Sequence, residues 1–173
     1  MRHSRPLLAA AAAAVLALGL SGAAWGAPLK HKPQPAQGMY HPSPVRPKPK
    51  SAPEDTPMAQ HFLVFQVSRP DKLSKVLALN NAANTKAAYG TDNVAVEIVA
   101  YGPGLKMLLK DSKYAARIQR MAEQQKVHFS ACANTMKHFG ITKDDLVPAA
   151  NVVSSGVHRI NELQEAGWSY IRP

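Results

Sequence analysis

The sequence has little cysteine, few acidic residues and no long apolar run. Among its 173 residues there is one cysteine, Cys132, and there are 11 acidic residues against 21 lysines and arginines. A single cysteine excludes a disulfide and a two- or four-cysteine metal site within one protomer, so we expect neither a metal nor a cofactor. The net charge of +10 is not accompanied by RNA-recognition, helix-turn-helix or zinc-finger spacing, so we expect no nucleic-acid partner.

The first 26 residues have the order of a secretory signal peptide. Arg2 and Arg5 precede an uncharged run at 7–20, and small residues follow as far as Gly26. A membrane anchor is the alternative, but the run is shorter than the about 20 apolar residues that span a bilayer. We therefore expect cleavage near Ala24 or Gly26, export to the periplasm, and no membrane association after cleavage.

Residues 27–57 are expected to form a disordered, proline-rich linker. Nine of the 14 prolines lie between Pro28 and Pro57, and the residues between them include almost no large apolar side chain. Such a stretch cannot bury a core, and its prolines favour extended polyproline II conformers. The sequence therefore predicts a semi-rigid spacer that leads to a folded domain at 58–173.

The folded domain alternates predicted strands with helical segments. Apolar runs rich in β-branched and aromatic residues predict buried strands at 62–67, 94–101 and 127–131, with a weaker one at 151–153. Helical spacing of apolar residues fills the segments between them. Strands separated by helices pair in parallel through right-handed crossovers. We therefore expect an α/β fold, a three-layer α/β/α sandwich with a mainly parallel sheet of about five strands.

Cys132 is the most informative candidate residue, because it ends a predicted strand and precedes a short helix. Ligands gather at the carboxyl ends of strands in an open parallel sheet. Free backbone N–H groups at the helix start favour the thiolate, and Lys137 would add positive potential. We expect the sulfur to be open to the loop, with a pKa below the usual thiol value. A buried structural cysteine is the alternative, and position alone does not separate the two.

The turn from Gly102 to Lys106 is a second candidate. Gly102 and Gly104 permit close backbone approach, and a helix start follows, as in turns that hold phosphate. Met107 stands where a dinucleotide fingerprint needs glycine, so a tight strand-to-helix turn is the default interpretation. His128 lies four residues before Cys132 along the strand, about 13 Å away. It is a poor base for the thiol and is expected to find a partner in or beside the sheet.

Several stretches together resemble the exported branch of the DsrE/DsrF-like family over residues 60–173. The stretches are Phe65-Gln66-Val67, Leu79-Asn80-Asn81, residues 99–108, residues 131–137 and residues 167–173. The resemblance implies a DsrE- or flavodoxin-like three-layer fold and assembly into trimers or hexamers. It also implies a role in sulfur relay, because a cysteine at the position of Cys132 carries a persulfide in relay members of the family.

Two functional hypotheses follow from the residues and the resemblance. In the first, the protein is a periplasmic sulfur carrier or sulfurtransferase-like protein that loads Cys132 with sulfane sulfur from a donor protein or a small sulfur species. Asn134 and Thr135 would shape the turn that stabilises the anion, beside Lys137. In the second, the protein is a non-catalytic binding module that holds a small anionic ligand at a subunit interface. The residues proposed for that site are Tyr101, Gly102, Gly104, Lys106 and the Cys132 loop.

Overall fold

The structure is a computed structural model that describes residues 53–173. The expected signal peptide at 1–26 and residues 27–52 of the expected linker lie outside the described residues. The last linker residues are described: Thr56 is fully buried, and Asp55 Oδ1 lies 3.0 Å from His128 Nε2. The packed part of the chain therefore begins before residue 58. Among the described residues, no helix is both long enough and apolar enough to cross a membrane.

The described chain forms a five-stranded, all-parallel sheet with helices between the strands, as the sequence predicts. The strand order is β4-β3-β2-β1-β5. The strands are β1 (His61–Val67), β2 (Val94–Ala100), β3 (Val127–Cys132), β4 (Ala150–Val153) and β5 (Ser169–Ile171). The α-helices are α1 (Lys72–Tyr89), α2 (Ala115–Gln125), α3 (Ala133–Phe139) and α4 (Gly156–Glu165), and the 3₁₀ helices are η1 (Gly102–Leu108) and η2 (Lys143–Asp145).

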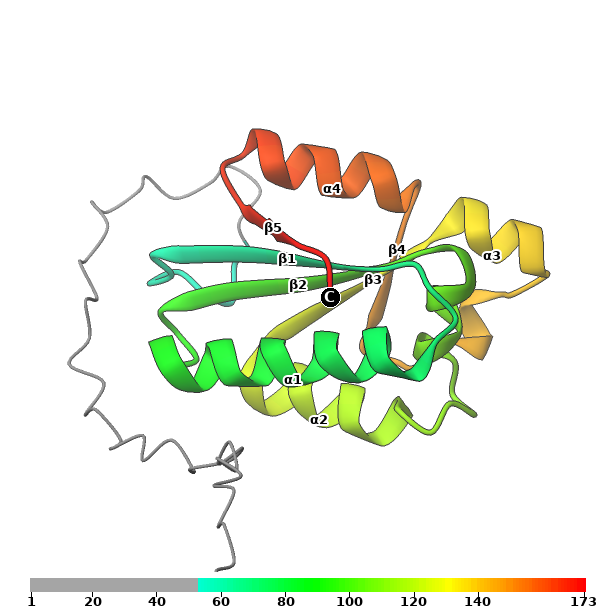
Figure 1. The fold of residues 1–173 in the computed structure, drawn as a ribbon, viewed down its shortest axis with the longest axis horizontal. Helices are drawn as coiled ribbons and strands as arrows, with labels where there is room; N and C mark the ends of the chain where they lie inside the picture. Colours follow the sequence, from blue (N-terminus) through cyan, green and yellow to red (C-terminus); the bar gives the residue numbers. More distant parts are fainter. Residues whose placement is uncertain (1–52) are drawn as a thin grey trace, which may run out of the picture. The chain divides into compact units, whose positions relative to one another are not determined.

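The helices cover the sheet from both sides, which gives the expected three layers. Helices α1 and α2 lie on one face, and α4 lies on the other (Figure 1). Helix α4 connects β4 at one edge of the sheet to β5 at the opposite edge, so it crosses the face diagonally. This long crossover brings the first turn of α4 over the ends of the central strands.

Each face of the sheet has its own hydrophobic cluster. The larger cluster joins α1, α2 and η1 to the sheet, and fully buried Phe65, Ile98 and Phe129 belong to it. The smaller cluster packs Ile160 and Leu163 of α4 on the opposite face. Strand β2 is buried along its whole length, because strands on both sides and helices on both faces surround it.

The parallel arrangement places four loops at one edge of the sheet. These loops follow β1, β2, β3 and β4, and each leads into a helix. The loop after β1 ends at Asp71, whose carboxylate accepts a 2.8 Å hydrogen bond from the Ser74 N–H and caps α1. The expected helical run after β2 is the 3₁₀ helix η1. The loops after β2, β3 and β4 meet around Cys132 and form the candidate site.

Candidate functional site

Cys132 is the last residue of β3 and the N-cap of α3. Its side chain is buried, with 5% of its surface exposed, so the expectation that the sulfur is open to the loop is wrong. The first turn of α4 is the cause. A Cβ built on Gly156 would lie 3.3 Å from the Cys132 Cβ, which shows that the start of α4 lies directly against the thiol. The residue that shields the thiol, Gly156, lies 24 positions after Cys132 in the sequence.

The thiol is buried and makes no capping hydrogen bond to the start of α3, but the polar groups around it shift its pKa. Burial raises the pKa of Cys132, and the Thr135 hydroxyl and the backbone N–H groups of Gly156, Thr135 and Asn134 lower it. The donors outweigh burial, so the pKa lies below its ordinary value of 9.0. The direction and one of the two expected causes, the N–H groups at the start of α3, are those predicted from the sequence; the Thr135 hydroxyl and the Gly156 N–H were not predicted. Lys137 is exposed and is not among the groups that shift this pKa.

Thr135 connects the loop after β3 to the loop after β2. The Gly102 N–H donates a 2.9 Å hydrogen bond to Thr135 Oγ1. Because this oxygen accepts from Gly102, its own hydrogen is free to point at the sulfur of Cys132. Strands β2 and β3 are neighbours in the sheet, which brings these two loops together. Gly102 therefore acts on the thiol through Thr135.

The glycines of the second candidate turn are required for packing. A Cβ at Gly104 would lie 2.3 Å from the Val67 carbonyl oxygen, so η1 can approach the end of β1 only with glycine there. The Gly104 N–H donates to the Ser68 carbonyl at 3.2 Å, and the Gly102 N–H donates to Thr135. Both N–H groups that could have held an anion therefore have protein partners. Lys106 is exposed.

Tyr101 belongs to a hydrogen-bonded group at the same edge of the sheet. Its hydroxyl accepts a 2.6 Å hydrogen bond from Gln66 Nε2, and the same amide nitrogen donates to Ser68 Oγ at 3.0 Å. The Tyr170 hydroxyl donates to the side-chain amide oxygen, Oε1, of Gln66. Tyr101 also touches the start of α4, since its Cβ and Cδ1 would both lie 3.0 Å from a Cβ on Gly156. Tyr101 and Cys132 therefore both pack against the start of α4.

Three predicted binding residues line one small cavity beside the thiol. The cavity measures about 390 Å³ and is lined by Gly102, Pro103, Asn134, Thr135, His138 and Phe139. Lys106 reaches its rim, because its ammonium lies 5.2 Å from the centroid of the Phe139 ring. Tyr101, Gly104 and Lys137 are not part of the lining. The structure therefore brings Gly102, Asn134 and Thr135 together and separates Lys137 from them.

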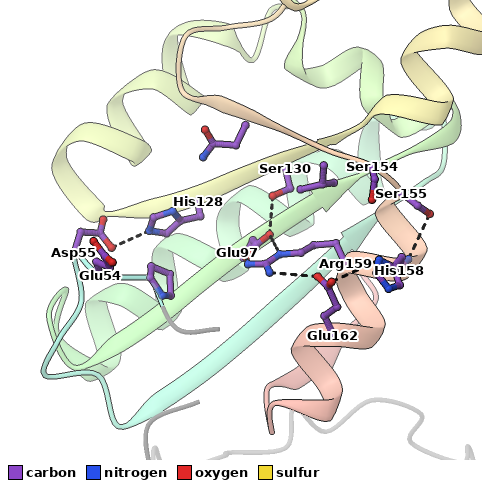
Figure 2. A pocket seen from close by; sticks show the side chains of 13 residues that line it. Glu54, Asp55, Glu97, His128, Ser130, Ser154, Ser155, His158, Arg159 and Glu162 are labelled. Carbon is purple, nitrogen blue, oxygen red and sulfur yellow. Dashed lines mark hydrogen bonds and ion pairs between the residues drawn. The ribbon is translucent and has the colours of Figure 1, made fainter. Parts of the chain in front are cut away.

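A second polar cluster lies on the α4 face of the sheet (Figure 2). Glu97 of β2 is 2% exposed, and Arg159 of α4 donates to it through Nε at 2.9 Å and Nη2 at 2.7 Å. The Ser130 hydroxyl donates to the same carboxylate at 2.6 Å. These residues border a cavity of about 680 Å³. His128 also lines it, and its partner is the carboxylate of Asp55, a residue that was expected to belong to the disordered linker.

The comparisons with known proteins agree with the fold. Residues 61–173 match the model of the DsrE/DsrF-like family. The chain belongs to the DsrE/DsrF-like family. A solved structure described as a protein of unknown function, MTH1491 from Methanobacterium thermoautotrophicum, is 37% identical. It superposes with a TM-score of 0.62 and covers 65% of this chain and 99% of its own. No curated protein matches the chain.

In this member of the DsrE/DsrF-like family, the sequence prediction missed Gly156, Glu97 and Arg159. The importance of Glu97 could have been recognised from the sequence, because it is a lone charge inside the apolar run 94–100. A carboxylate buried in such a strand needs a partner. Its partner, Arg159, lies 62 residues away. The role of Gly156 could not be predicted from the residues next to it in the sequence, because this role comes from its contact with Tyr101 and Cys132.

Proposed function

We propose that this chain is an exported, periplasmic sulfur carrier of the DsrE/DsrF-like family, in which Cys132 bears a persulfide. One observation carries the proposal: Cys132 ends β3 at the start of α3, where the Thr135 hydroxyl and the backbone N–H groups of Gly156, Thr135 and Asn134 lower its pKa. A structural cysteine packed as a small hydrophobe needs no such set of donors. The thiolate is the form of cysteine that attacks sulfane sulfur.

The proposed step is a sulfur transfer without net oxidation. The Cys132 thiolate attacks the outer sulfur of a persulfide, R–S–SH, and a new bond forms between the two sulfur atoms. The bond between the donor's own two sulfurs breaks, and the thiolate R–S⁻ leaves with the electron pair of that bond. Cys132 then holds –S–SH, and the leaving thiolate takes a proton from water. Attack by an acceptor thiolate on the same outer sulfur returns Cys132 to the thiolate.

Cys132 does not line the cavity of about 390 Å³, but two of its neighbours in sequence do. Asn134 and Thr135 belong both to its wall and to the donors around the thiol. A small persulfide seated there would lie against the groups that hold Cys132. The same donors would stabilise the charge that shifts to the outer sulfur when the persulfide ionises.

Intact mass spectrometry tests the proposal directly. Incubation of the protein with polysulfide or a low-molecular-weight persulfide should add the mass of one sulfur atom, and reduction with a thiol should remove it. The matched control is Cys132→Ser, which keeps the shape and should gain no sulfur. Wild-type protein that stays unmodified while a free cysteine peptide becomes loaded would contradict the proposal and leave the binding-module hypothesis.

The export and assembly parts of the proposal have their own tests. N-terminal sequencing of the protein from cells should give a start near residue 25 or 27, in the periplasmic fraction. A start at Met1 in the membrane fraction would contradict export. We also propose a homo-oligomer, a trimer or hexamer by family resemblance, and light scattering should give three or six times the protomer mass. A monomer at micromolar concentration would contradict assembly.

A further inference from the structure

We propose that the buried Glu97–Arg159 ion pair positions the first turn of α4 so that the Gly156 N–H points at the Cys132 sulfur. The inference rests on the proposed function, because it concerns the reactivity of the same thiol. Glu97 and Arg159 are positioning residues here, since neither touches the sulfur in the described contacts. Nothing in the sequence motif around Cys132 points to them.

The ion pair ties α4 to the sheet within one turn of Gly156. Arg159 follows Gly156 by three residues and forms a two-bond fork to Glu97, at 2.9 and 2.7 Å. A bidentate guanidinium–carboxylate pair fixes orientation as well as distance. Ser130 holds the carboxylate from β3 at 2.6 Å. Because β3 also carries Cys132, the thiol and the Ser130 hydroxyl that holds Glu97 of β2 lie on the same strand.

The close packing at Gly156 makes this position sensitive to small movements. A Cβ there would lie 3.0 Å from Tyr101 and 3.3 Å from the Cys132 Cβ, so the α4 backbone runs in van der Waals contact with both residues. Val157, the next residue, is 60% exposed and cannot hold the turn in place. The contacts that fix this turn to the sheet are therefore made by Arg159, through Glu97, and by the buried Ile160.

The Glu97→Gln variant separates positioning from a simple charge effect. Removal of a nearby negative charge by itself favours the thiolate, so it would speed alkylation of Cys132 at neutral pH. Loosening of α4 weakens the Gly156 N–H bond to the sulfur, so it would slow alkylation. The two explanations predict opposite signs for the same substitution. Positioning predicts the slower reaction.

The experiment measures the rate of iodoacetamide alkylation against pH on the native full chain. In Glu97→Gln we expect the rate at pH 7 to fall about fivefold, as when one charge-assisted hydrogen bond weakens by roughly half. Its pH profile should move to higher pH. Ser130→Ala, which removes one hydrogen bond to Glu97 and leaves the ion pair, should give a smaller change in the same direction. This milder variant keeps the test valid if Glu97→Gln fails to fold.

Two controls separate positioning from general destabilisation. Glu162→Gln removes an exposed carboxylate 3.6 Å from Arg159 and should leave the profile unchanged. Leu163→Ala removes a fully buried side chain of α4 one turn beyond Arg159 and should lower stability without moving the profile. Besides Glu97 and Arg159, the titratable side chains on the surrounding elements include Tyr101, Lys106, His128, Lys137, His138, His158, Glu162 and Glu165. Of these, only Glu162 is changed, in its own control variant.

The result that overturns the inference is an unchanged or faster reaction in both Glu97→Gln and Ser130→Ala. An equal shift in Leu163→Ala would also overturn it, because the effect would then follow stability alone. The proposed function fails by a different result, the absence of sulfur uptake in the wild type. If the wild type takes up no sulfur but Glu97→Gln still shows the expected shift of the alkylation profile, the carrier role is refuted and the positioning role is retained.

Discussion

Lys86 allows a prediction whose sign and size both follow from its surroundings. It lies in the last turn of α1 and is 2% exposed. Its ammonium donates to the Val94 carbonyl at 2.6 Å and to the Thr91 carbonyl at 3.1 Å. Burial is the largest influence and lowers the pKa of Lys86 from 10.5 to about 8, although Asp55 and Asp92 oppose it. The folded protein therefore releases this proton at lower pH than the unfolded chain does.

The sign of the pH dependence follows from proton counting. Below pH 8 both states hold the proton, and above pH 10.5 neither does. Between these values the unfolded chain binds more protons, so the free energy of unfolding rises with pH. A shift from 10.5 to about 8 corresponds to a rise of about 3 kcal/mol across the window. A Lys86→Met variant also loses the two hydrogen bonds to carbonyl groups. This loss changes the free energy of unfolding by the same amount at every pH, so it does not alter the dependence on pH.

The assay is urea denaturation of the wild type and Lys86→Met at intervals from pH 7 to pH 10.5. The free energy of unfolding of the wild type minus that of Lys86→Met should increase as the pH rises. Lys126→Met is the control, because Asp92 raises the pKa of Lys126. The contribution of Lys126 to the free energy of unfolding is therefore constant below pH 10.5. A difference that stays flat, or that moves against the wild type, would show that the carbonyls outweigh burial and would refute the reasoning.

Two further predictions concern the loops around the thiol. Gly104→Ala places a Cβ 2.3 Å from the Val67 carbonyl oxygen, so η1 must move. Urea denaturation should show that the free energy of unfolding falls by about 2 kcal/mol. A variant as stable as the wild type would contradict the packing role of Gly104. Thr135→Val removes a hydroxyl that lowers the pKa of Cys132 and the acceptor of the Gly102 N–H. It should slow iodoacetamide alkylation at pH 7 and cost about 1 kcal/mol of stability, whereas an unchanged rate would exclude the hydroxyl as a donor to the thiolate.

The local pattern predicted most elements because their burial is regular. The apolar runs at 62–67, 94–101 and 127–131 correspond to β1, β2 and β3, which are the three strands with neighbours on both sides. Edge strands are shorter and half exposed, so their pattern is weaker. This explains why β4 was only a weak prediction and why β5, three residues long, had no clear signal. The parallel order followed from the helices between the strands.

The candidate site was predictable only in part. The sequence placed Cys132 at the end of a strand and put Asn134 and Thr135 in the next turn, because this arrangement is local. It also indicated a charge effect of Lys137, which the structure does not support. The donors that decide the pKa include the Gly156 N–H. No local pattern predicts a contact between residues 24 positions apart that belong to different elements.

The sequence by itself determined the α/β class, the parallel pairing and the position of Cys132 at the carboxyl end of a strand. Periodicity and chain order carry that information, since each depends on neighbouring residues. The tertiary structure alone decided that the thiol is buried, which donors surround it and which residues hold those donors. The physical reason is the crossover of α4 from β4 to β5, which lays Gly156 over Cys132 and Arg159 over Glu97. The ionisation of a single thiol depends on these long-range contacts.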